Sequence, residues 1–135
     1  MKSFLFLPLL LLAITFTSCK KEEIIQEVVP NRTITTTIQP GDWQLDAANN
    51  SYFVSINMPE IDQRVLETNG VLAYVSFDGK TYEAVPDVFG GTTLQVTHSL
   101  GKIYVDLQNA DGSAPTKAFD GQISIKIVLV ESDPV

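Results

Sequence analysis

The sequence predicts an all-β domain built as an antiparallel sandwich of two sheets. Apolar and polar side chains alternate with a period of two through most of the chain after residue 32. Turn-forming Asn-Gly, Asp-Gly and Gly-Gly pairs separate these segments at intervals of about ten residues. No segment in this part of the chain has the apolar period of a long helix. A closed β-barrel is the alternative that the same pattern allows.

Seven segments show the pattern of strands, so we expect seven or eight strands in an immunoglobulin-like or similar sandwich. Each segment is bounded by residues that favour turns. In chain order they are residues 33–39, 51–58, 70–78, 80–85, 92–100, 102–108 and 122–131. Only residues 59–68 have a helical spacing, which Ile61 and Val65 supply, and they leave room for one or two turns.

The first residues predict a secretory signal peptide. Lys2 provides the positive charge, and the mainly apolar residues 4–16 follow it. As a helix this run would be roughly 20 Å long, too short for a hydrocarbon core of about 30 Å. Two small residues, Thr17 and Ser18, precede Cys19, the only cysteine. We therefore expect cleavage between Ser18 and Cys19.

Residues 16–19, Phe-Thr-Ser-Cys, resemble the lipobox of bacterial lipoproteins. The commonest form of that motif has leucine where this chain has Phe16, and the looser form is similar to that of Bacteroidota lipoproteins. The resemblance implies that Cys19 receives a diacylglyceryl group carrying fatty acids such as palmitate. The outer-membrane lipid that holds this anchor would then be one partner of the protein.

A second resemblance lies within the domain. The order of short elements is similar to that of small Bacteroidota lipoproteins with one β-sandwich and no assigned activity; the elements are Asp42-Trp43, Tyr52-Phe53, residues 58–61, residues 70–74, Tyr82 and Val85-Pro86. It implies a β-sandwich domain in the cell envelope. From this resemblance, together with the leader and the strand pattern, we expect a signal peptide at 1–18, a lipidated tether at 19–31 and a sandwich at 32–135. The resemblance transfers no catalytic residue to this chain.

The residues after Cys19 predict a tether and a location. Residues 20–31 are charged at their start and end near Pro30, although paired apolar residues also allow a short amphipathic helix. Lys21, Glu22 and Glu23 resemble the lysine-plus-two-acids signal that sends some Bacteroidota lipoproteins to the cell exterior. The alternative is an ordinary polar tether. We expect an outer-membrane protein that faces the exterior.

The net charge of −7 restricts the partners of the protein. Nucleic acids and anionic lipid headgroups would repel an acidic surface. We therefore expect no nucleic-acid partner, and the protein or glycan that the domain would bind stays unidentified. No residue pattern indicates a cofactor.

His98 is the only histidine, so a serine–histidine–acid site would have to use it, with Ser99 or Ser55 as nucleophile. No G-x-S-x-G turn is present to expose a serine. We expect a non-catalytic protein rather than an enzyme. The leading hypothesis is a cell-envelope lipoprotein that acts as a binding, adhesion or scaffolding module. A carbohydrate-binding accessory lipoprotein is the alternative, and a small hydrolase using His98 is the third hypothesis.

Two further groups are candidates for ligand binding. Asp106, Asn109 and Asp111 precede Gly112 in an oxygen-rich segment that a hard cation would accept, but they also suit a hairpin turn, and we expect no metal site. Trp43 is the candidate ligand-binding aromatic. It would stack on a sugar ring together with four tyrosines, or it would fill the core. The tyrosines are Tyr52, Tyr74, Tyr82 and Tyr104.

Overall fold

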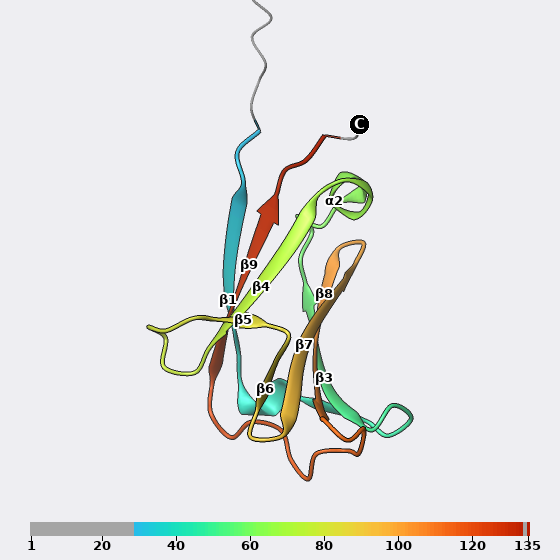
Figure 1. The fold of residues 1–135 in the computed structure, drawn as a ribbon, viewed down its shortest axis with the longest axis vertical. Coiled ribbons are helices and arrows are strands. Elements are labelled where there is room, and N and C mark those ends of the chain that lie inside the picture. Colours follow the sequence, from blue (N-terminus) through green and yellow to red (C-terminus); the bar gives the residue numbers. More distant parts are fainter. Residues whose placement is uncertain (1–28, 134) are drawn as a thin grey trace, which may run out of the picture.

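The computed structural model describes residues 29–133 and residue 135, and its strands form two antiparallel sheets (Figure 1). The four-stranded sheet has the order β1 (Arg32–Ile38), β9 (Ile123–Val130), β4 (Gly70–Ser76) and β5 (Glu83–Val85). The five-stranded sheet has the order β2 (Gln44–Asp46), β3 (Ser51–Asn57), β8 (Lys102–Asn109), β7 (Thr92–Ser99) and β6 (Asp87–Phe89). Both sheets keep free edge strands and do not close into a barrel. The predicted two-sheet sandwich is confirmed.

The described residues contain nine strands, whereas the sequence predicts seven or eight. Each of the seven predicted segments holds a strand, and the two additional ones are β2 and β6. These two strands have three residues each and lie at the two edges of the five-stranded sheet. Three residues are too few for an alternating pattern to be recognised.

The core lies between the sheets and follows from the two-residue period. Alternate residues of β9 point inward, and Ile125 and Ile127 are fully buried. They face a row of similarly buried residues on β8, namely Ile103, Val105 and Leu107. Val54 of β3 is buried in the same core, and Ile56 packs against it.

The predicted short helix is present as α2 (Gln63–Glu67). Asp62 caps it, because its carboxylate accepts a hydrogen bond of 3.0 Å from the backbone N–H of Val65. Val65 itself is buried, as are Met58 and Ile61 before the helix. The helix therefore closes one end of the sandwich. A second short helix, the 3-10 turn η1 (Pro40–Asp42), connects β1 to β2.

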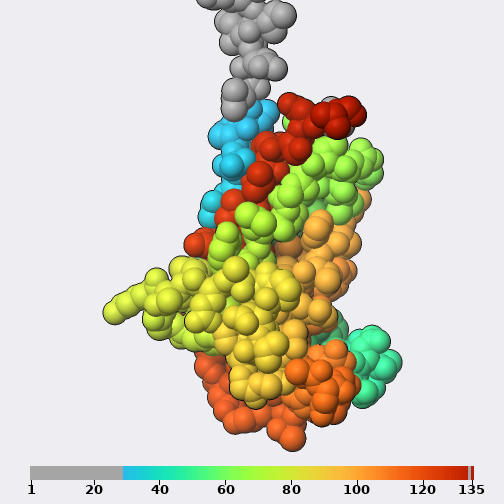
Figure 2. Space-filling model, in the orientation of Figure 1, coloured from blue at the N-terminus to red at the C-terminus, as the bar shows by residue number. Residues whose placement is uncertain are grey.

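The strand predicted at residues 80–85 is shorter than expected, since β5 begins only at Glu83. The reason is the side chain of Asp78, whose Oδ1 accepts hydrogen bonds from the backbone N–H groups of Lys80 (2.8 Å) and Thr81 (2.7 Å). These amides are therefore not free to pair with β4. The turn projects from the side of the molecule as the yellow-green segment in Figure 2.

The chain changes sheets between β5 and β6. A cis peptide bond joins Val85 to Pro86 at this point. β5 pairs with β4 in one sheet, and β6 pairs with β7 in the other. Residues 83–89 therefore cover one side of the sandwich in its middle and lower part, as Figure 1 shows.

The two termini of the domain lie at the same end of the sandwich, next to α2 (Figure 1). Glu131 connects the segments there: its carboxylate lies 3.6 Å from Arg32 and 3.6 Å from Arg64, and it accepts a 2.9 Å hydrogen bond from Asn69. The turn at residues 47–50 and the loop at 110–122 lie at the opposite end. The chain before β1 thus enters far from these loops. No helix among the described residues is long and apolar enough to cross a membrane.

Candidate functional site

His98 lies in a groove at the open side of the sandwich, between β4 and β5 of one sheet and β7 of the other. The groove has a volume of about 210 Å³ and is lined mainly by apolar side chains, among them Val71, Leu72 and Val96. Tyr74 is the only other lining residue with a polar side-chain group. No serine, aspartate or glutamate lines the groove.

The two serines considered as partners of His98 point away from it. Ser99 follows His98 directly in β7, so its side chain points to the other face of the sheet. Ser55 and Thr97 both pair with Tyr104 and share the outward face with it. The structure therefore does not bring His98 and a serine together.

Trp43 fills the core and is only 9% exposed. Its ring packs edge-on against Phe119 with 5.9 Å between the ring centroids. The sequence predicts that Trp43 either stacks on a sugar ring or fills the core, and this geometry is that of a core residue. Its buried Nε1 donates no hydrogen bond in the described residues.

The tyrosines are spread over different surfaces. Tyr74 and Tyr82 flank Lys126 on the four-stranded sheet, with the ammonium 4.8 and 4.1 Å from the ring centroids. Tyr52 packs against the core, and Tyr104 lies on the outer face of the five-stranded sheet. They do not form one flat platform with Trp43.

The structure divides the candidate cation ligands between two places. Asn109 and Asp111 bind within their own turn: Asn109 donates to the Ser113 hydroxyl at 2.9 Å, and Asp111 accepts from the Ser113 N–H at 2.9 Å. Hydrogen bonds from the Ser113 hydroxyl and N–H lower the pKa of Asp111. Asp106 points outward from β8 instead. In the described part of the chain, no group of three or more His, Cys, Asp or Glu residues could hold a metal ion.

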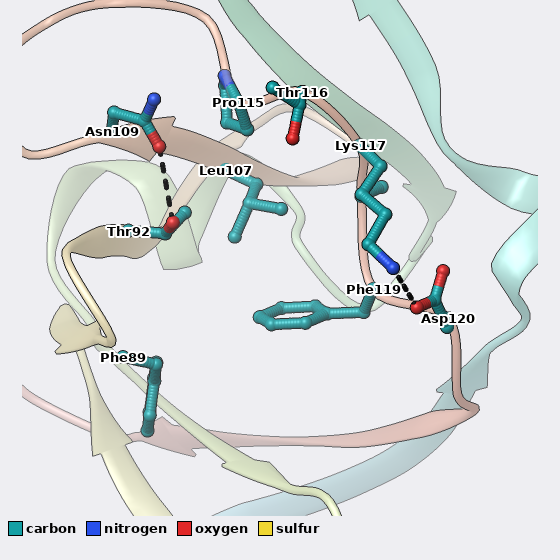
Figure 3. A pocket seen from close by; sticks show the side chains of 10 residues that line it. Phe89, Thr92, Leu107, Asn109, Pro115, Thr116, Lys117, Phe119 and Asp120 are labelled. Carbon is teal, nitrogen blue, oxygen red and sulfur yellow. Dashed lines mark hydrogen bonds and ion pairs between the residues drawn. The ribbon is translucent and has the colours of Figure 1, made fainter.

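A pocket of about 340 Å³ lies under the loop that connects β8 to β9 (Figure 3). Phe89, Leu107 and Phe119 give it an apolar interior. Four of its polar residues are already paired with one another. Thr92 donates a hydrogen bond of 3.2 Å to Asn109, and Lys117 forms an ion pair with Asp120.

A second pocket, which we call the outer polar pocket, lies on the outer face of the five-stranded sheet. Its volume is about 310 Å³, and every residue that lines it is polar: Asp46, Asn49, Ser51, Gln95, Asp106 and Gln108. Four strands and one turn contribute these residues. Gln95 and Asp106 are direct partners in the pairing of β7 with β8, so their side chains stand side by side.

The two carboxylates of the outer polar pocket differ in their surroundings. Asp46 accepts hydrogen bonds from the side chain of Asn49 (2.8 Å) and from the N–H groups of Asn49 and Ala48, and these lower its pKa. Burial raises the pKa of Asp106, and the nearby charge of Asp46 raises it further. No hydrogen bond from the described residues stabilises the ionised carboxylate of Asp106.

Several groups of this pocket have no partner among the described residues. The Asp106 carboxylate, the Gln95 amide and the Ser51 hydroxyl form no hydrogen bond with the described residues, and none of them is a fully buried polar atom. Gln108 uses its amide N–H on the carbonyl of Asn49 at 2.8 Å, which leaves its carbonyl oxygen free. The pocket therefore presents unused donors and acceptors to solvent.

Sequence reasoning identified Asp106 but not Asp46, Ser51 or Gln95. The alternation of β7 and β8 places Gln95 and Asp106 on outward positions, which is the only signal that the sequence contains. The register that sets them opposite each other depends on the turn at Gly101, whose φ is +71°. The predicted lipidation site Cys19 and the signal at Lys21, Glu22 and Glu23 lie outside the described residues.

Comparison with protein-family models, with curated proteins and with solved structures finds no match to this chain.

Proposed function

We propose that the protein is a non-catalytic lipoprotein of the bacterial cell envelope, whose sandwich domain acts as a binding, adhesion or scaffolding module. The observation that carries this proposal is the leader of residues 1–18, which ends directly before the only cysteine. Lipidation would explain why a reactive cysteine thiol stands at the N-terminus of the mature protein in an oxidising compartment.

The surroundings of His98 support a binding module over an enzyme. A general base needs a nucleophile within hydrogen-bond reach and a third group that orients it. The groove around His98 offers neither, because apolar side chains and Tyr74 line it. The small hydrolase therefore has less support than the binding module.

The arrangement of the domain also suits an anchored module. The chain enters β1 at one end of the sandwich, beside α2. The turn at residues 47–50 and the loop at 110–122 lie at the other end. A lipid at Cys19 would therefore direct this second end, with its loops, away from the membrane.

The test replaces the lipidated residue. Cys19→Ala should lose incorporation of labelled palmitate, and the protein should leave the membrane fraction or remain unprocessed. Lys20→Ala is the matched control next to the cleavage point and should be lipidated normally. A Cys19→Ala protein that stays anchored with an unchanged mature mass would show that the proposal is wrong.

A further inference from the structure

The surface pockets differ in how many of their polar groups already form hydrogen bonds or ion pairs. In the pocket of Figure 3, Thr92, Asn109, Lys117 and Asp120 are paired with each other. The groove at His98 is mainly apolar. The outer polar pocket combines an entirely polar lining with several donors and acceptors that form no hydrogen bond with the described residues.

We propose that the outer polar pocket binds a neutral, hydroxyl-rich ligand, namely a sugar ring of a glycan, through Asp106, Gln95, Ser51 and Gln108. This inference rests on the proposed function of the protein as a binding module and names the ligand class of that module.

The free groups of the pocket fit hydroxyl groups because they include both donors and acceptors. A sugar hydroxyl donates one hydrogen bond and accepts others. The Asp106 carboxylate and the free carbonyl of Gln108 accept, the Gln95 amide does both, and the Ser51 hydroxyl does both. Because Gln95 and Asp106 face each other across β7 and β8, they can bind neighbouring hydroxyls of one ring.

Ser51 contributes a hydroxyl to the lining of the outer polar pocket. This hydroxyl forms no hydrogen bond with the described residues and is not one of their buried polar atoms that lack a partner, so it is accessible to solvent and to a ligand. The register of β3 with β2 and β8 places Ser51 on the same outward face as Asp46 and Asp106.

Charge disfavours an anion, and the volume of the pocket favours a ligand larger than a single ion. No lysine or arginine lines the pocket, while two carboxylates do, so an anion would be repelled. A bare cation needs its oxygen ligands at about 2.3–2.6 Å on several sides. The pocket, with about 310 Å³, is instead at the lower end of the range of small-molecule sites, roughly 300–1,000 Å³.

Two aromatic residues on the same face provide a surface beside the polar groups. Phe53 of β3 pairs directly with Asp106, and Tyr104 precedes Asp106 by two residues in β8. Both therefore point outward with Asp106, and both are partly exposed. The apolar C–H face of a sugar ring can pack on such rings while its hydroxyls reach the pocket.

The test uses the full chain, purified in a detergent without sugar groups because a glycosidic detergent would compete. Saturation-transfer NMR is recorded with glucose, galactose, mannose, fucose and N-acetylglucosamine, each added alone. Calcium chloride and methylammonium chloride serve as cationic probes, and isothermal titration calorimetry measures their binding in separate titrations. The variants are Asp106→Ala, Gln95→Ala and the isosteric Asp106→Asn. Glu83→Gln on β5 is the matched control, since Glu83 is an exposed carboxylate of the other sheet.

We expect at least one of the five sugars to bind. Its Kd should rise about tenfold or more in Asp106→Ala, because a hydrogen bond to a charged group is lost, and it should also rise in Gln95→Ala. Glu83→Gln should bind as the wild type does. The far-UV circular dichroism of each variant shows whether the fold is retained, and Asp106→Asn keeps the shape of the side chain if the alanine variant does not fold.

Three outcomes would overturn the inference. The first is that none of the five sugars binds. The second is that a sugar binds to Asp106→Ala as it does to the wild type. The third is that no sugar binds, while calcium or methylammonium binds in a way that depends on Asp106. None of them affects the anchor. A chain that is lipidated at Cys19 but binds no sugar contradicts only the ligand class. A chain that binds sugar but carries no lipid contradicts only the proposed anchor.

Discussion

Single residues of this domain show opposite electrostatic environments. Asp78 is held by hydrogen bonds within its turn, and Asp106 is half-buried and accepts no hydrogen bond from the described residues. The first arrangement stabilises the charged carboxylate, and the second destabilises it. Removing the charge of Asp78 should therefore lower the free energy of unfolding at pH 7, whereas removing the charge of Asp106 should raise it.

Asp106→Asn should make the protein more stable at pH 7. Burial and Asp46 raise the pKa of Asp106 above its ordinary value of 3.8, so ionising this group costs free energy in the folded state. The cost is absent below pH 3.8 and develops as the pH rises through the folded-state pKa. Thermal unfolding of both proteins at pH 7 and at pH 3 should show the gain only at pH 7. A variant that is less stable at pH 7 would contradict this explanation.

Asp78→Ala should have the opposite effect. Hydrogen bonds from the N–H groups of Thr81 and Lys80, together with those from the hydroxyls of Ser76 and Thr81, lower the pKa of Asp78 from 3.8 to about 2. The stability that the carboxylate provides is present above pH 3.8 and is lost as the pH falls toward 2. Urea unfolding should show a loss for the variant at pH 7 and a smaller difference near pH 2. Equal differences at both pH values would contradict the assignment.

At the scale of elements, the sequence predicts well those strands that are long and buried on one face. β3, β7, β8 and β9 lie within one or two residues of their predicted bounds, because most of their inward residues are apolar. β2 and β6 escape prediction, since three residues at a sheet edge show no period. The start of β5 depends on hydrogen bonds to one aspartate side chain, which the two-residue period does not report.

The candidate site is harder to predict than the strands, and the reason is register. Asp46 belongs to β2, far in sequence from Gln95 and Asp106, which belong to the consecutive strands β7 and β8. The alternation indicates which face each residue occupies. It does not indicate that Gln95 pairs with Asp106, because this depends on the length and the geometry of the turn between β7 and β8. Trp43 likewise has polar neighbours in sequence but packs in the core.

Ile125→Asp should unfold the domain. Ile125 is fully buried in β9, the strand that pairs with both β1 and β4. An unpaired charge in an apolar interior costs several kcal/mol, against a total stability of about 5–15 kcal/mol. Thr35→Asp is the control, because Thr35 is exposed on β1 and lies beside Lys126. Circular dichroism should show loss of β-structure for Ile125→Asp and a native spectrum for Thr35→Asp, and a folded Ile125→Asp protein would contradict the assignment of the core.

At the scale of the whole molecule, the sandwich has one end for the incoming chain and one for loops. Glu131 joins β1, α2 and the segment after β9 through Arg32 and Arg64, so the entry point is held in place. The residues of the outer polar pocket at Asp46, Asn49 and Ser51 lie toward the other end, near the turn at 47–50. A tether at the first end would leave the pocket accessible from solvent.

If the protein is the outer-membrane lipoprotein that we propose, its domain faces either the periplasm or the cell exterior. If Lys21, Glu22 and Glu23 form an export signal, the domain lies outside the cell, and a protease added to intact cells reaches it. A cleavage site inserted into the exposed turn at residues 47–50 makes the assay independent of natural cut sites. The cells should lose the wild-type domain and keep the variant with Lys21, Glu22 and Glu23 changed to Ala. Lysed cells should lose both, which shows that the site can be cut in each protein. Protection of both proteins in intact cells would place the domain in the periplasm and would leave these three residues as part of a polar tether.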